Sequence, residues 1–116
     1  MNINELTIGQ AREIAALVNP TQTIRFCDGH PWNVGKNYFI RTVTHHFTGR
    51  LVAVYEQELV LEDAAWIADD GRFHQAITTG SWNEIEPFAE GSKAIIGRAS
   101  LIDATEISTA LPRSQK

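Results

Sequence analysis

Three short groups of residues carry side chains that are able to bind a metal ion or act as acids and bases. Cys27-x-x-His30 is half of a zinc site, but no second Cys or His pair follows at metal-binding spacing. His45-His46 are neighbours in a predicted strand, where adjacent side chains point to opposite faces and do not share one ion. Asp69-Asp70 precede a glycine in a predicted solvated turn, which does not provide the enclosed surroundings that a pair of catalytic carboxylates needs. We therefore expect no metal site and no pair of catalytic carboxylates.

The other signatures of catalysis are also missing from the sequence. It has no nucleophile with a base at recognisable spacing and no glycine-rich loop for phosphate. We expect a protein that is not an enzyme and that uses no cofactor. Two tryptophans, Trp32 and Trp82, fall in predicted loops, where an indole ring either packs on the core or contacts a partner.

Length and composition predict one globular domain over residues 1–110 and a flexible tail over residues 111–116. The chain has 116 residues, of which 43% are hydrophobic and 21% charged, and this suits a single modest core. Its formal charge of -4 argues against non-specific nucleic-acid binding, which usually needs a basic surplus. No apolar run long enough to span a membrane and no signal peptide is visible. The single Cys27 favours a reducing compartment, so we expect a cytoplasmic protein.

The pattern of apolar residues predicts a mainly β chain that begins with a helix. That helix covers about residues 7–18, with a short strand at 23–27 after it. The centre is a predicted hairpin of residues 51–55 and 59–61, opened by a turn at 48–50. The remaining predicted elements are a strand at 38–47, a short helix at 72–77, and two strands at 93–96 and 101–107. Five strands in so short a chain predict a small, strongly bent barrel of the SH3-like or OB type.

Two stretches of the sequence resemble the motifs of Sm-like proteins, which include the bacterial Hfq branch. The run from Gly49 to Val54, the polar turn after it and Leu59-Val60-Leu61-x-Asp63-Ala64 resemble the first motif. Residues 95–102, IIGRASLI, are similar to the second. The resemblance implies a five-stranded barrel whose fourth strand pairs with the fifth strand of the next subunit to form a ring of six or seven. The implied homo-oligomer interface is formed by Ala94, Ile95, Ile96, Leu101 and Ile102.

The same resemblance implies a site for RNA, although the sequence departs from the family pattern there. Tyr55 and Gln57 stand in the turn where the family binds uridine, and Arg98 and Ser100 stand in the loop of the second motif. Glu58 is nearest to the family's asparagine, and a carboxylate repels phosphate. Ala99 and Ser100 replace the glycine and asparagine that follow the family's arginine.

A second resemblance, to small proteins of tailed phages and prophages, is carried by GKNYFIRTVT, ELVLEDAAWIAD and IIGRASLIDATEI. It implies a structural role and virion proteins as partners, with the virion as an alternative location. The leading hypothesis is therefore a ring-forming assembly protein that makes contacts through its edge strands and Trp32 or Trp82. The alternative is an RNA-binding Sm-like ring.

Overall fold

The computed structural model describes residues 29–116. The chain divides into two compact units, Met1–Trp32 and Asn33–Lys116, of which the second holds the whole described sheet. The helix predicted at about residues 7–18 and the strand predicted at 23–27, with Cys27, lie outside the described residues. One domain over residues 1–110 stays a prediction. In the described end of the first unit, the Trp32 backbone N–H donates to His30 Nδ1 at 3.2 Å.

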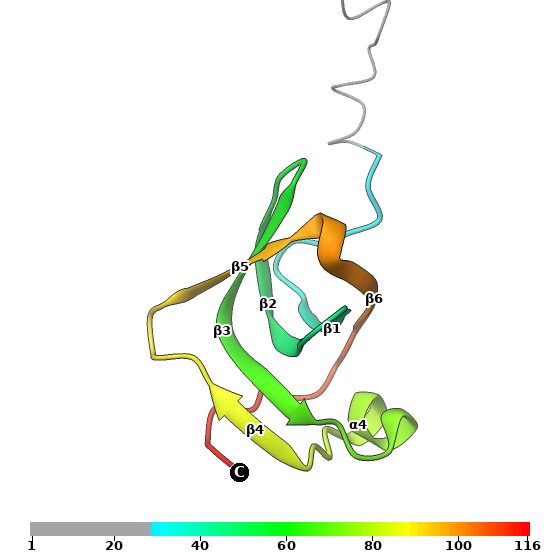
Figure 1. Ribbon diagram of the computed structural model, residues 1–116, viewed down its shortest axis with the longest axis vertical. Helices are drawn as coiled ribbons and strands as arrows, with labels where there is room; N and C mark the ends of the chain where they lie inside the picture. Colours follow the sequence, from blue (N-terminus) through cyan, green and yellow to red (C-terminus); the bar gives the residue numbers. More distant parts are fainter. Residues whose placement is uncertain (1–28) are drawn as a thin grey trace, which may run out of the picture. The chain divides into compact units, whose positions relative to one another are not determined.

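The second unit is built on one antiparallel sheet (Figure 1). Its order is β4-β3-β2-β1-β6, and β5 also pairs with β3. The strands are β1 (Asn37–Thr42), β2 (His46–Val54), β3 (Glu58–Asp69), β4 (Glu84–Pro87), β5 (Lys93–Gly97) and β6 (Leu101–Glu106). β3 is the longest of them, and it pairs with β5 along its first half and with β4 along its second. The prediction of a mainly β chain is confirmed, but the described residues hold six strands rather than five.

The predicted central hairpin is confirmed, but its boundaries differ from the prediction. Val54 of β2 lies opposite Leu59 of β3, so residues 55–57 form the turn. The single strand predicted at 38–47 is wrong, because β1 ends at Thr42 and β2 begins at His46. In the turn between them, Thr42 Oγ1 donates to the carbonyl oxygen of His45 at 2.7 Å. A hydroxyl bonded to the backbone in this way stabilises a tight turn, which strand propensity alone does not predict.

The turn predicted at 48–50 is also wrong, because Gly49 lies inside β2. A Cβ at this position would lie 2.9 Å from Leu61 Cβ and 3.3 Å from Ala64 Cα, both on β3. The glycine therefore permits a close approach of two strands. β3 bends beside it, since the β2–β3 register shifts between Thr48 and Arg50 and Asp63 takes a left-handed φ of 52°.

One short helix precedes the last strands, as the sequence predicts. It is α4 (Phe73–Thr79), and Gly80 ends it with a φ of 76°. A single 3-10 turn, η2 (Arg98–Ser100), joins β5 to β6. The prediction missed β4, because Ile85 is the only strongly apolar residue in the sequence Glu84–Pro87 and gives no strand pattern.

A cluster of buried side chains packs between the end of the sheet and α4. Trp82 is 2% exposed, and its ring centroid lies 4.8 Å from that of Phe39. The expectation that Trp82 offers its ring to a partner is therefore wrong. Besides these two, the cluster contains Ala65, Ile67, Ala76, Ile85 and Ile107.

The segment after β6, for which the sequence predicts a flexible tail at 111–116, runs back to β4. The Ile85 and Lys116 backbones exchange two hydrogen bonds of 3.1 and 3.0 Å, and Lys116 Nζ donates to the Trp82 carbonyl oxygen. Arg113 Nη1 donates to the Ala64 carbonyl oxygen at 3.1 Å. Backbone pairing with Lys116 thus covers part of the β4 edge.

Candidate nucleic-acid interface and sheet edges

The turn between β2 and β3 presents an aromatic ring to solvent. Tyr55 is 56% exposed, and its backbone N–H donates to the carbonyl oxygen of Glu58 at 2.8 Å, which closes the turn. Glu56 and Gln57 between them are exposed. An exposed ring on a closed turn is a surface on which a flat ligand such as a base can stack.

Arg98, the first residue of η2, binds to this turn although 43 residues separate it from Tyr55. Its backbone N–H donates to the Gln57 carbonyl oxygen at 2.8 Å, and its Nη1 donates to the Tyr55 carbonyl oxygen at 2.8 Å. The contact follows from strand pairing, since Gly97 at the end of β5 lies opposite Glu58 at the start of β3. The structure therefore brings together Tyr55, Gln57 and Arg98, which are three of the four predicted nucleic-acid-binding residues.

The fourth residue, Ser100, serves the local backbone. Its hydroxyl donates to the Gly97 carbonyl oxygen at 2.7 Å, which closes η2. Its own carbonyl oxygen accepts a hydrogen bond of 2.9 Å from the N–H of Val43 in the β1–β2 turn. These contacts do not direct Ser100 toward the Tyr55 turn.

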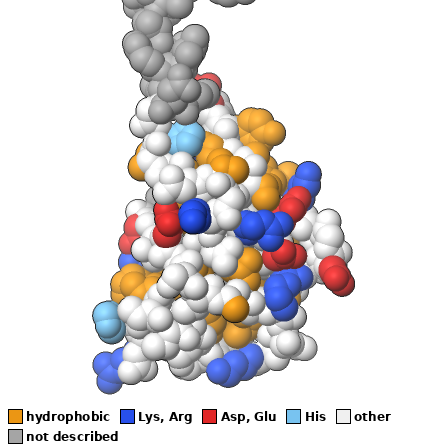
Figure 2. All heavy atoms as spheres, turned by 180° about the vertical axis from the view of Figure 1, so that it is seen from behind, with side chains coloured by type: hydrophobic (Ala, Val, Ile, Leu, Met, Phe, Trp, Pro, Cys, Tyr) orange, Lys and Arg blue, Asp and Glu red, His pale blue; other side chains and the backbone are white. Residues whose placement is uncertain are grey.

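The charge around this turn is unfavourable for a polyanion. Arg98 supplies one positive charge, while Glu56 and Glu58 supply two negative charges in or beside the same turn. Basic and acidic side chains are also interspersed on the face shown in Figure 2, which has no broad basic surface. The arrangement therefore suits stacking and hydrogen bonding of single bases better than non-specific attraction of phosphates.

Three strands of the described sheet, β4, β5 and β6, each pair with one other strand, and the backbone of Lys116 covers part of the free edge of β4. Within residues 29–116, the single partner of β5 is β3 and the single partner of β6 is β1. Ile95 of β5 is 69% exposed and Ile102 of β6 is 60% exposed. A strand edge with free backbone groups and exposed apolar side chains is a template for another strand.

The predicted oligomer interface divides into two sets of side chains. Ile95 and Ile102 face solvent, while Ala94 and Ile96 are buried against the sheet and Leu101 is half-buried. This alternation follows from the period of two along β5. β5 and β6 do not pair with each other within the described residues, so barrel closure stays a prediction.

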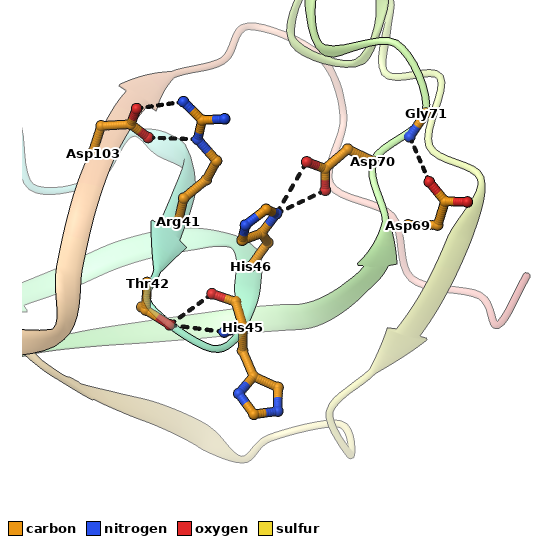
Figure 3. Close-up of polar contacts among 8 residues, drawn as sticks. All are labelled: Arg41, Thr42, His45, His46, Asp69, Asp70, Gly71 and Asp103. Carbon is orange, nitrogen blue, oxygen red and sulfur yellow. Dashed lines mark hydrogen bonds and ion pairs between the residues drawn. The ribbon is translucent and has the colours of Figure 1, made fainter.

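The two adjacent histidines have different partners (Figure 3). His46 Nδ1 lies 3.0 Å from both carboxylate oxygens of Asp70. The His45 ring centroid lies 5.3 Å from that of Trp66, which is 39% exposed. Asp70 thus has a specific partner, which the interpretation of Asp69-Asp70 as a solvated turn did not foresee. No group of three or more His, Cys, Asp or Glu that could hold a metal ion occurs in residues 29–116.

Two ion pairs hold β1 to β6 and β2 to β3. Arg41 Nε donates to Asp103 Oδ1 at 2.7 Å, and this hydrogen bond lowers the pKa of the Asp103 carboxyl. Arg50 Nη1 donates to Asp63 Oδ2 at 2.7 Å, beside the bend in β3, and lowers the pKa of Asp63 in the same way. Local sequence patterns do not predict the first pair, because 62 residues separate Arg41 from Asp103.

Among the described residues, no helix is both long enough and apolar enough to cross a membrane.

Comparisons with known proteins give distant likenesses to solved structures, among them two Sm heptamers. No family model matches the chain, and no curated protein matches it. The chain is similar to a heptameric archaeal Sm protein at a TM-score of 0.46 and 16% identity, over 64% of this chain and 88% of that one. It is also similar to the SmAP1 heptamer of P. aerophilum at a TM-score of 0.47 and 16% identity, over 75% and 93% of the two chains. Both matched chains are Sm heptamers, and both TM-scores lie below 0.5.

Proposed function

We propose that this chain is a non-enzymatic assembly protein that forms a homo-oligomeric ring of small β-barrel subunits. In this ring, β5 of one subunit pairs with β6 of the next. The observation that carries the proposal is that β5 and β6 each pair with one strand in residues 29–116 and, unlike the third edge strand β4, have no tail segment paired to their outer side. Their apolar side chains, Ile95 and Ile102, are the two most exposed isoleucines of that region.

Pairing β5 with β6 would satisfy both edges at once. It would supply partners for the free backbone groups and would bury the two isoleucines. Full burial of such a side chain contributes about 1.5–3 kcal/mol. Because the two edges are different surfaces, each subunit uses both, and the contact repeats head to tail until it closes. The Sm-like motifs favour closure with six or seven subunits.

A charged residue at the β5 edge tests the proposal. Ile95→Lys places a charge where the partner strand would lie, and it should reduce the native mass toward that of the 12.9 kDa monomer. Val34→Lys is the matched control, because Val34 is 56% exposed and lies on neither edge strand. Light scattering on a sizing column measures both variants. An unchanged mass for Ile95→Lys would exclude β5 as the contact.

The proposed role extends to virion proteins as partners, because the sequence also resembles small phage and prophage proteins. A structural role of this kind needs strand edges rather than a catalytic site. It would place the protein in the cytoplasm or, when phage-encoded, in the virion.

RNA binding is the second candidate function, and a specific observation favours it. The predicted RNA-binding residues Tyr55, Gln57 and Arg98 meet at one turn although the sequence separates them by up to 43 residues. The exposed Tyr55 ring would stack on a base, and the unused N–H groups of Arg98 would donate to a base carbonyl or a phosphate. Ser100 has a structural role at η2 in this proposal.

A binding titration with a fluorescent oligouridine tests this second function. Tyr55→Ala should weaken binding by about 10-fold, since one stacked base contributes about 1–3 kcal/mol. Tyr55→Phe keeps the ring and should bind as the wild type does. Binding that Tyr55→Ala leaves unchanged would exclude this turn as the site.

A further inference from the structure

We infer that Lys93 of β5 and Glu106 of β6 form an ion pair between neighbouring subunits and thereby set the register of the ring contact. The inference rests on the proposed assembly through β5 and β6. Lys93 and Glu106 would fix which residues of β5 and β6 lie opposite each other, and they would favour this contact over other ways of joining two copies.

Lys93 is available for such a contact. It is the first residue of β5, it is exposed, and it makes no ion pair within residues 29–116. Its neighbour on the same side of the strand is the exposed Ile95, because the burial pattern of β5 alternates. The outward side of β5 therefore carries a lysine, an isoleucine and then Gly97.

Glu106 is the opposite charge at the matching end of β6. It is exposed, and its Oε2 accepts hydrogen bonds from Asn33 Nδ2 and, at 3.4 Å, from the Tyr38 hydroxyl. These two donors fix the carboxylate in place. Its other oxygen, Oε1, has no hydrogen-bond partner in the described part of the chain and is free to accept from a lysine.

One antiparallel register brings these features together. When Lys93 lies opposite Glu106, Ile95 lies opposite Ala104 and Gly97 lies opposite Ile102. The small Ala104 leaves room beside Ile95. A Cβ at Gly97 would meet nothing within 4 Å, so this position has room for the 60%-exposed Ile102 side chain. Charge pairs and apolar pairs directly opposite each other are the arrangement that stabilises a sheet.

The charges disfavour the two symmetric alternatives. Pairing β6 with β6 about Asp103 would set this carboxylate opposite its own copy, and the second strand would supply no opposite charge. Pairing β5 with β5 about Ile95 would set Lys93 opposite Gly97, with no attraction. Of these three contacts, β5 against β6 sets opposite charges face to face, and it is heterologous, as closure into a ring requires.

A charge-swap series tests the ion pair. Lys93→Glu and Glu106→Lys each replace an attraction by a repulsion, and each should raise the concentration at which the full-length oligomer dissociates by ~5-fold or more at low salt. The double variant restores opposite charges and should assemble at nearly the wild-type concentration. Lys36→Glu is the control, because Lys36 is an exposed lysine outside both strands. Sedimentation velocity at several concentrations measures all four.

A cysteine pair tests the register. In a Cys27→Ser background, Ile95→Cys with Ala104→Cys should oxidise rapidly to covalently linked subunits, because directly opposed residues have Cα atoms within disulfide range. Ile95→Cys with Ile102→Cys, which stand opposite each other when the strands slip by two residues, should link more slowly.

The outcomes distinguish the register of the contact from the assembly through β5 and β6 on which it depends. Rescue by the double charge swap, with faster linking of residues 95 and 104, would support the register. If the charge swaps leave the dissociation concentration of the oligomer unchanged, or if residues 95 and 102 link faster than residues 95 and 104, the register is overturned and the proposed ring still stands. A wild-type chain that stays monomeric at every concentration would overturn both.

Discussion

Arg98 Nη1 lies 2.8 Å from the carbonyl oxygen of Tyr55, and this hydrogen bond joins η2 to the β2–β3 turn across 43 residues of sequence. The Arg98 backbone N–H adds a second bond to the Gln57 carbonyl oxygen. The guanidinium therefore holds the turn that presents the Tyr55 ring. This position gives Arg98 a structural task that is independent of any ligand.

Arg98→Ala should destabilise the chain slightly. The substitution removes one exposed side-chain hydrogen bond and leaves the backbone bond in place, so we expect a loss of about 0.5–1 kcal/mol in the free energy of unfolding. Urea denaturation followed by tryptophan fluorescence measures it. Arg72→Ala is the matched control, because Arg72 is exposed and makes no side-chain hydrogen bond at the start of α4. Equal stability of the two variants would show that the Tyr55 contact contributes nothing.

Gly49→Ala should destabilise the fold more than a surface change does. The added Cβ would lie 2.9 Å from Leu61 Cβ, so β2 and β3 must separate at the bend, at a cost of about 1–3 kcal/mol. Ser81→Ala is the control, since Ser81 is exposed and lies outside β2, β3 and the two strands of the proposed contact. Thermal unfolding compares the two. A melting temperature for Gly49→Ala equal to that of Ser81→Ala would contradict the close approach.

Trp82→Ala should be the most damaging single change in the buried cluster. The ring is 2% exposed, and its removal leaves a large cavity beside Phe39, at a cost of about 3–5 kcal/mol. Trp82→Phe should cost much less. It keeps an aromatic ring and removes the indole Nε1, a buried donor with no partner among the described residues.

Trp66→Ala provides the comparison for this series, because its 39% exposure predicts a smaller loss. Chemical denaturation of the three variants gives the order. A loss at Trp66 equal to that at Trp82 would contradict the assignment of Trp82 to the core.

Acid should weaken the fold through Asp103. The hydrogen bond from Arg41 lowers the pKa of the folded carboxyl below its ordinary value of 3.8. The stability that this pair contributes is therefore fully present above about pH 4 and is lost as the pH falls through the lowered folded pKa. Asp103→Asn should lose less stability than the wild type between about pH 7 and pH 2.5.

Urea midpoints at the two pH values measure this difference, with Glu90→Gln as a control at an exposed loop position. The wild-type loss at low pH should also shrink at high salt, which screens an exposed pair. An equal pH dependence in Asp103→Asn and the wild type would show that the pair is not formed.

The sequence predicts the elements that have a regular local pattern. The β2–β3 hairpin, α4 and the two last strands were predicted because apolar runs and turn residues mark them. The motif resemblance also placed Tyr55, Gln57 and Arg98 in one candidate site, and strand pairing brings them into contact. Their binding role stays a prediction.

The features that the sequence did not reveal depend on distant contacts. Gly49 resembles a turn glycine, and only the approach of Leu61 from β3 shows why it lies inside a strand. β4 has one strongly apolar residue, Ile85, and forms because β3 and Lys116 supply its backbone partners. Asp70 resembles a solvated turn residue until His46 is placed beside it. No local pattern encodes such pairs.

The native mass of the full-length wild-type chain tests the central claim most directly. Sedimentation velocity over a wide range of concentrations, with absorbance at 260 and 280 nm recorded together, gives both the assembly state and any bound nucleic acid. The proposed ring predicts a single species of about six or seven times the 12.9 kDa chain mass at the higher concentrations. A monomer at every concentration would contradict the proposal that β5 and β6 pair between subunits.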